Sequence, residues 1–184
     1  MMNFVIGIDA STTKTGVSVF KLNKSGKKLV HYYLIDAENN APISSELKTK
    51  KKDNKATRKK KSNLRTMARV EYTIREMLFI LRKFQKSTTR IAIEDTYGTT
   101  DPSSVKSLAR IQGSVYGFCL ENNIELKFVA PSTWRSKVGI PLEINGKRLK
   151  RDDFKRLSVA MVKEKYEIEV GDDLADAILI GEVA

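Results

Sequence analysis

The chain has 184 residues, with 34 Lys and Arg against 22 Asp and Glu, and a net charge of +12. This length fits one ordinary domain with a sizeable core and perhaps one long insertion, and the strong positive charge favours a polyanionic partner. One Cys and one His exclude a disulfide within the chain and nearly exclude a zinc cage, and no apolar run approaches the roughly 18 residues of a membrane span.

The first part of the chain predicts three antiparallel strands. Residues 3–9 are apolar at almost every position, which is typical of a strand buried on both faces, and residues 15–22 alternate between apolar and polar. The short turn between them requires a hairpin. A Gly-containing loop at 23–27 then leads to a third strand over 29–35.

A basic segment at about 37–62 separates these strands from the rest of the chain. Between Lys48 and Lys61 there are nine basic residues and a single acid, Asp53. We interpret the segment as a flexible insertion that binds phosphates; a solvated loop that only keeps the protein soluble is the alternative. The candidate phosphate-binding residues within it are Lys50, Lys51, Lys52, Arg58, Lys59, Lys60 and Lys61.

Strands and helices alternate after the basic segment. Asp101 and Pro102 form an expected helix cap and first turn. The alternation predicts parallel strands joined by right-handed crossovers. The expected elements are a helix at 64–84, a strand at 91–94, a helix at 103–121, a strand at 125–130, a loop-rich stretch at 131–150, and helices at 152–165 and 172–183.

This order of elements is that of an α/β ribonuclease-H-like fold. It predicts one domain over 1–184 with a mixed five-stranded sheet, in which three antiparallel strands are followed by parallel ones, flanked by helices. In that layout the first strand is central and the fourth lies beside it. The strands at 3–9 and 91–94 are therefore expected to end side by side.

Four carboxylates fall where this fold brings elements together. Asp9 and Glu94 end two apolar strands, and Asp173 and Asp176 share one face of the last helix. Ionised groups in apolar surroundings are costly unless they are paired or bind a metal, and oxygen ligands suit Mg²⁺ or Mn²⁺. We therefore expect phosphodiester hydrolysis with two ions about 3.5–4 Å apart. Each acid alone has an ordinary alternative: a turn cap for Asp9, an Arg partner for Glu94, and a helix N-terminus for Asp172 and Asp173.

The motifs around these acids resemble those of the RuvC family of Holliday junction resolvases, in its small phage-type branch. The resemblance extends over nearly the whole chain. It implies that Asp9 bridges two Mg²⁺ ions, which Mn²⁺ can replace, and that Glu94 binds one of them. Asp173 with Asp176 would bind the other ion and position the water. The matching segments are Gly7-Ile8-Asp9, Thr15-Gly16, Ile93-Glu94 and Asp173-Leu174-Ala175-Asp176-Ala177.

The same resemblance implies how DNA is bound. Tyr97 would stack on a base, which contributes about 1–3 kcal/mol, whereas packing over the following loop is the alternative. Arg135 and Lys155 would contact the scissile phosphate, with surface solubility as the alternative, and Trp134 is expected in the core or as a lid. The implied partner is branched DNA, four-way junctions or forks, cut by a homodimer with two acidic sites. Phage origin and action in the bacterial cytoplasm are also implied.

Other functions fit parts of the same sequence. Residues 7–16 also resemble the first phosphate loop of sugar kinases and actin-like ATPases, but those enzymes bind nucleotide between two such domains and carry a second Gly-rich loop. A non-catalytic nucleic-acid-binding module on the same fold would need no metal. An RNA nuclease of this fold is a further alternative, because RNA and DNA are distinguished by contacts to the 2′-hydroxyl, which the sequence does not reveal. Phosphate contacts by the basic segment predict weak sequence preference.

Overall fold

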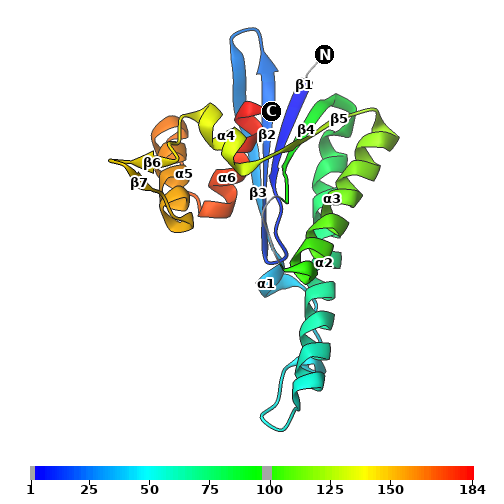
Figure 1. Cartoon of the computed structure of the whole chain (residues 1–184). Helices are drawn as coiled ribbons and strands as arrows, with labels where there is room; N and C mark the ends of the chain where they lie inside the picture. Colours follow the sequence, from blue (N-terminus) through cyan, green and yellow to red (C-terminus); the bar gives the residue numbers. More distant parts are fainter. Residues whose placement is uncertain (1–2, 97–100) are drawn as a thin grey trace.

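A five-stranded sheet runs through the middle of the computed structural model, which describes residues 3–96 and 101–184 (Figure 1). The strand order is β3-β2-β1-β4-β5. β1 pairs antiparallel with β2 and parallel with β4, so the predicted mixed sheet with a central first strand is confirmed. The strands are β1 (Asn3–Asp9), β2 (Lys14–Asn23), β3 (Gly26–Asp36), β4 (Thr88–Glu94) and β5 (Glu125–Val129).

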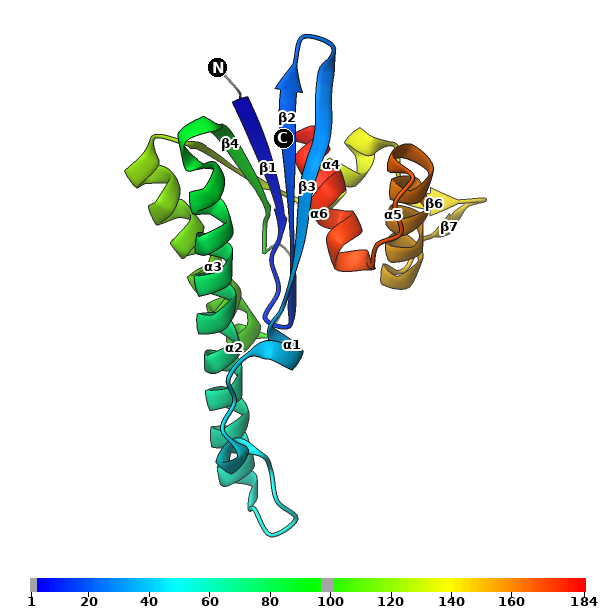
Figure 2. The same ribbon diagram turned by 180° about the vertical axis from the view of Figure 1, so that it is seen from behind.

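Helices cover both faces of this sheet. α2 and α3 lie on one side, and α4, α5 and α6 lie on the other, as the two opposite views show (Figures 1 and 2). In the parts of the chain that the structure describes, no helix is long and apolar enough to cross a membrane. The helices are α1 (Ala37–Asn40), α2 (Lys55–Phe84), α3 (Pro102–Asn122), α4 (Pro131–Val138), α5 (Arg151–Tyr166) and α6 (Asp172–Val183), with short 3-10 turns η1 (Ser45–Leu47) and η2 (Gln85–Ser87).

The central strand explains the continuous apolar run at the start of the chain. Ile6 and Ile8 of β1 pack into the core on the side of α2 and α3, whereas Val5 packs into the core on the side of α6. A strand with a helical layer on each face must be apolar on both. Cys119 lies in the first core, where burial raises the pKa of its thiol to about 11, as expected of a structural cysteine.

Glycines allow α6 to lie directly against β1 and β2. A Cβ atom on Gly7 would lie 2.2 Å from the amide nitrogen of Gly181, and one on Gly16 would lie 2.3 Å from the carbonyl oxygen of Asp173. The Ser18 hydroxyl of β2 donates a hydrogen bond of 2.7 Å to the carbonyl oxygen of Ala177. The glycines of the sequence motif therefore set how closely the helix carrying two acids approaches the sheet.

The long helix α2 begins nine residues earlier than its apolar periodicity predicts. Asn54 caps it by accepting from the amide of Thr57 at 2.9 Å, and Lys and Arg are good helix formers even without an apolar face. The first turns of α2 extend beyond the sheet (Figures 1 and 2). The prediction of a wholly flexible basic insertion was therefore wrong for residues 55–61.

The stretch 131–150, expected to be rich in loops, contains a further helix and a small hairpin. Pro131 occupies the first turn of α4, where its missing N–H costs nothing. Gly139 ends the helix with a left-handed φ of 89°. The hairpin that follows is formed by β6 (Glu143–Ile144) and β7 (Lys147–Arg148).

Candidate active site

The four predicted acids lie on three elements that meet at one edge of the sheet. Asp9 and Glu94 end β1 and β4, which pair in parallel. Asp173 and Asp176 lie in the first two turns of α6, which packs on β1 and β2. Burial, and then the negative charges of the other three acids, raise the pKa of Asp9 well above its ordinary value. The fold therefore brings together the carboxylates that the sequence singled out.

Asp176 is the most deeply placed of these acids, with 7% of its surface exposed. Burial raises its pKa to about 6; the nearby Ser158 hydroxyl opposes this rise, and the charge of Glu94 adds to it. Its Oδ1 is buried without a hydrogen bond, and its Oδ2 lies 4.0 Å from the guanidinium of Arg135. A buried, unpartnered carboxylate oxygen among other acids is unfavourable unless a cation compensates it.

Glu94 is fixed by hydrogen bonds from two other elements. The indole N–H of Trp134 on α4 donates to its Oε2 at 2.7 Å, and the side-chain amide of Gln112 on α3 donates to its backbone carbonyl at 2.9 Å. Burial raises the pKa of Glu94, while the Trp134 hydrogen bond and the charges of Arg135 and Arg151 oppose that rise. Trp134 is thus in the core, as expected, and it also contacts the site.

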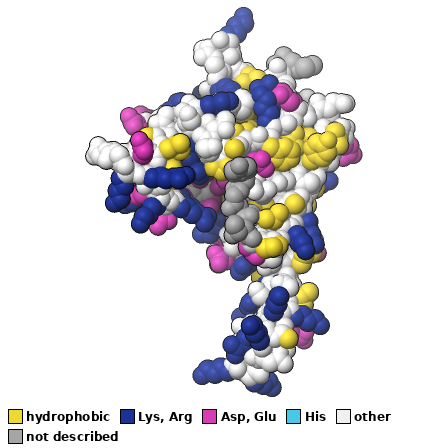
Figure 3. Space-filling model, viewed as in Figure 1, with side chains coloured by type: hydrophobic (Ala, Val, Ile, Leu, Met, Phe, Trp, Pro, Cys, Tyr) yellow, Lys and Arg dark blue, Asp and Glu magenta, His cyan; other side chains and the backbone are white. Residues whose placement is uncertain are grey.

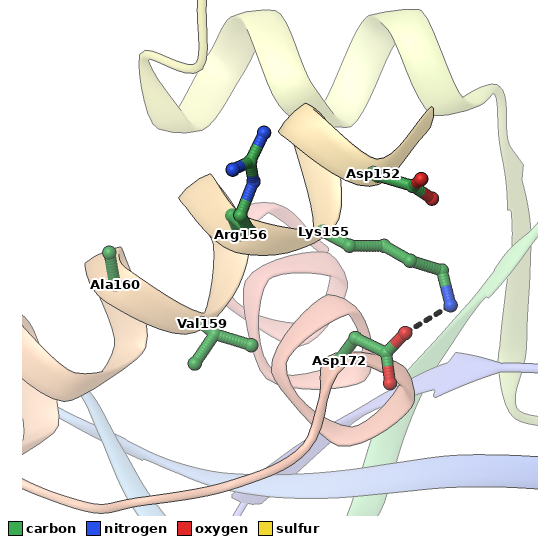
Figure 4. Close-up of a pocket in the computed structure, with 6 residues that line it drawn as sticks. All are labelled: Asp152, Lys155, Arg156, Val159, Ala160 and Asp172. Atoms are coloured by element: carbon green, nitrogen blue, oxygen red, sulfur yellow. Dashed lines mark hydrogen bonds and ion pairs between the residues drawn. The ribbon is translucent and has the colours of Figure 1, made fainter. Parts of the chain in front are cut away.

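Asp172 and Asp173 are adjacent in sequence but differ in their surroundings. Figure 4 shows Lys155 of α5 extending to Asp172, with which it forms an ion pair. Partial burial raises the pKa of Asp172, but the hydrogen bond and charge of Lys155 outweigh this and hold the pKa below its ordinary value. Burial and the charge of Asp172 raise the pKa of Asp173. The structure therefore separates an ion-paired Asp172 from Asp173, whose charge acts on Asp9.

The basic residues predicted to contact the scissile phosphate are directed towards protein groups. The guanidinium carbon of Arg135 lies 4.8 Å from the ring centres of both Trp134 and Phe154, and its side chain is only 19% exposed.

Two further cations, Lys14 and Arg151, lower the pKa of Asp173 by their charges and were not singled out from the sequence. Lys14 directly precedes the Thr15-Gly16 motif, and that position is the feature of the sequence that could have marked it as a site residue. Tyr97 lies outside the described residues.

The basic arm, residues 48–61, projects beyond the edge of the sheet at which β1 and β4 end (Figure 1). Figure 3 shows Lys and Arg side chains along its length. Lys61 forms an ion pair of 2.9 Å with Asp53, and Arg58 donates to the carbonyl oxygen of Lys51 at 3.0 Å, so these two residues fold the arm on itself. The other predicted DNA-binding residues of the arm are exposed: Lys50, Lys51, Lys52, Lys59 and Lys60.

The acid cluster suits a divalent cation in its chemistry. Its donors are carboxylate oxygens, which Mg²⁺ and Mn²⁺ prefer, and the raised pKa of Asp9 and the orphaned Oδ1 of Asp176 indicate negative charge that the protein does not compensate. Among the described residues, no three His, Cys, Asp or Glu side chains already converge as a metal cage. One carboxylate oxygen of Glu94, Oε2, accepts a hydrogen bond from the indole N–H of Trp134.

Comparison with known proteins identifies the fold. No family model and no curated protein sequence matches the chain. Thermus thermophilus RuvC, solved with a Holliday junction substrate, aligns with a TM-score of 0.62 and 16% identity over 97% of this chain and 90% of that one. The fowlpox virus resolvase bound to Holliday junction DNA gives 0.54 and 13% over 97% and 93%. The yeast mitochondrial Holliday junction resolvase gives 0.55 and 13% over 98% and 76%. These similarities confirm the predicted ribonuclease-H-like fold.

Proposed function

We propose that this chain is a metal-dependent endonuclease that hydrolyses phosphodiester bonds in four-way DNA junctions and related branched DNA, including forks. The observation that carries the proposal is the placement of four carboxylates at one edge of the sheet, where burial and then the charges of the other three raise the pKa of Asp9. The fold supports the choice of substrate, because RuvC and the fowlpox virus resolvase are both solved with Holliday junction DNA.

The carboxylates of Asp9, Glu94, Asp173 and Asp176 would hold two Mg²⁺ ions, with Mn²⁺ as a substitute. When bound, such ions supply a water of lowered pKa and stabilise negative charge on the leaving oxygen. The buried ends of β1 and β4 surround the acids with apolar side chains, which strengthens every charge interaction at the site.

Positive side chains beside the acids would ease the approach of a phosphate. Lys14 and Arg151 lower the pKa of Asp173 through their charges, and Lys155 does the same. A phosphodiester reaching four carboxylates would otherwise meet only repulsion. These cations therefore balance the site electrostatically, and the arrangement argues against a non-catalytic binding module, which has no use for the acids.

The basic arm would bind the phosphates of a duplex branch that leaves the site. Its exposed lysines at 50–52, 59 and 60 lie on a projection past the acidic edge (Figures 1 and 3). Lysine contacts to phosphate release counterions and carry no sequence information. We therefore propose weak sequence preference, with base stacking by Tyr97 as a separate contribution at the junction.

A junction has two symmetry-related strands to cut, so the proposal includes a homodimer. On α3, Ile111 and Val115 are buried in the core, whereas Tyr116 and Leu120 are 50% and 62% exposed. Phe128 of β5 is 47% exposed. An exposed apolar surface of this kind is typical of a contact site, and we propose it as the surface on which a second copy packs.

One experiment tests the activity and its rivals together. The purified protein is incubated with a four-way DNA junction, a linear duplex and an RNA–DNA hybrid, each with Mg²⁺, Mn²⁺ or EDTA. Paired, symmetric nicks in the junction that require the metal are the expected result. Preferential cutting of the RNA strand would favour an RNA nuclease, and ATP turnover with intact DNA would refute the proposal.

A further inference from the structure

Trp134 is the single tryptophan of the chain, and it lies beside the acid cluster. Its side chain is fully buried, in the same apolar core as Leu174 and Ile178 of α6. Its one polar atom, the indole nitrogen, donates to Oε2 of Glu94 at 2.7 Å. Because a buried indole N–H needs a partner, the packing of the ring and the orientation of the Glu94 carboxylate are fixed together.

The same ring also contacts the neighbouring cation. The guanidinium carbon of Arg135 lies 4.8 Å from the centre of the Trp134 ring and 4.8 Å from that of Phe154, and its terminal nitrogen lies 4.0 Å from Oδ2 of Asp176. The Trp134-Arg135 pair at the middle of α4 thus contacts an acid on β4 and an acid on α6. Two acids from different elements are therefore held by adjacent residues of a single helix.

We propose that Trp134 is a positioning residue for cation binding. Its N–H holds one oxygen of Glu94 and leaves the other oxygen available to a metal ion, while its ring keeps Arg135 against Asp176. The inference rests on the proposed function, because the cation belongs to that proposal. Hydrogen bonds that orient the ligands of a metal site typically account for about 10–100-fold in metal affinity.

The decisive test removes the N–H and keeps the shape of the ring. Trp134 is replaced by β-(3-benzothienyl)alanine, in which sulfur stands in place of the indole N–H, and Mn²⁺ binding is measured by calorimetry without DNA. We expect affinity about 10-fold weaker than in the unmodified protein. Trp134→Phe, which also lacks the donor, should weaken binding at least as much, and Ile140→Val, a trimmed residue of the same apolar core, should not.

Two results separate failure of this inference from failure of the proposed function. If the benzothienyl protein melts at the normal temperature and binds Mn²⁺ as well as, or more tightly than, the unmodified protein, Trp134 does not position Glu94. If the unmodified protein binds no Mn²⁺, the proposed function fails first.

The emission of Trp134 provides an independent readout, because no other tryptophan contributes. Titration with Mg²⁺ should shift the emission with the same midpoint as a calorimetric curve for Mg²⁺ binding to the same protein. Glu94→Gln, which keeps an acceptor for the indole N–H but removes a ligand charge, should shift that midpoint to higher Mg²⁺. Saturable Mg²⁺ binding with unchanged emission would overturn the inference.

Discussion

The acidic edge and the basic arm both concentrate like charges, but they do so in different surroundings. At the edge, Asp176 is almost fully buried, and burial together with the charges of the neighbouring acids raises the pKa of Asp9. On the arm, the lysines at 50–52 face solvent, and the one acid, Asp53, is ion-paired with Lys61. Repulsion is strong in an apolar interior and weak in water, where salt screens it.

This difference assigns the two regions different tasks. Buried acids can be ionised together only if a cation compensates them, which supports the proposal that the edge binds a metal. Exposed lysines are solvated, so their charges destabilise the fold little. Their contacts to the phosphates of a polyanion are favourable because they release the counterions condensed on it. We therefore expect changes at the edge to abolish chemistry and changes on the arm to alter binding and its salt dependence.

Neutralising Asp9 should separate chemistry from binding most sharply. We expect Asp9→Asn to slow junction cleavage by about 10²–10³-fold or more, because the site loses a charge where the proposed metal ions would be held. Junction affinity in EDTA should stay within about 2- to 3-fold of the wild type, since the arm is unchanged. Single-turnover rates and gel-shift titrations measure the two effects, with Glu164→Gln, an exposed acid on α5, as the control. Normal cleavage by Asp9→Asn would contradict the assignment.

Neutralising the arm should have the opposite effect. Replacing the three lysines at 50–52 with Gln should lower the slope of log affinity against log salt by up to about 0.9 for each phosphate that the arm no longer neutralises. The rate of cleavage at saturating protein should not change. The matched control replaces Lys24, Lys28 and Lys86, exposed residues outside both the arm and the site, and should leave the slope unchanged. Equal slopes for the two triple variants would refute a role for the arm.

The glycine contact beneath the edge should be sensitive to a single methyl group. Gly16→Ala places a Cβ 2.3 Å from the carbonyl oxygen of Asp173, so we expect the free energy of unfolding to fall by about 1–3 kcal/mol. A Cβ on Gly113 of α3 would meet no atom within 4 Å, so Gly113→Ala should stabilise the protein by up to about 1 kcal/mol. Urea unfolding measures both. A Gly16→Ala protein as stable as the wild type would mean that α6 does not lie so close to β2.

The metal-free protein should become less stable as pH rises through 6. Burial raises the pKa of Asp176 from 3.8 to about 6, so the folded state keeps a proton that the unfolded chain has released. The resulting stabilisation is complete below pH 3.8 and disappears as pH passes through about 6. In EDTA, we expect a lower melting temperature at pH 7.5 than at pH 5.5, by about 2–4 °C for each kcal/mol of stability. Asp176→Asn should reduce this difference; an identical difference in both proteins would exclude Asp176 as its source.

The sheet was predictable from the sequence because its strands are short apolar runs separated by clear turns. The acids were predictable because each ends such a run or lies on the face of an apolar helix, as Asp9 and Asp176 do. The start of α2 was not, since the arm carries no apolar periodicity and its helix depends on the Asn54 cap and on lysine propensity. Sequence spacing marks element boundaries well only where one face is buried.

The environment of the site was harder to predict than the acids that lie in it. Trp134 and Glu94 are 40 residues apart, and their hydrogen bond exists because α4, which packs against α6, brings the indole to the end of β4. Arg135 and Lys155 were expected to face phosphates, yet the Arg135 guanidinium contacts the rings of Trp134 and Phe154, and Lys155 pairs with Asp172. Such orientations depend on tertiary packing, which residue type and spacing do not specify.

Counting bound Mn²⁺ tests most directly the central claim, that these acids together hold two divalent cations. Electron paramagnetic resonance of free Mn²⁺ at pH 7.5, without DNA, gives the number of ions held by each chain. We expect two ions for the wild type and for Glu164→Gln, and weakened or abolished binding for Asp9→Asn and Asp176→Asn. A wild-type protein that binds no Mn²⁺, or Asp9→Asn and Asp176→Asn proteins that bind it equally well, would contradict the claim.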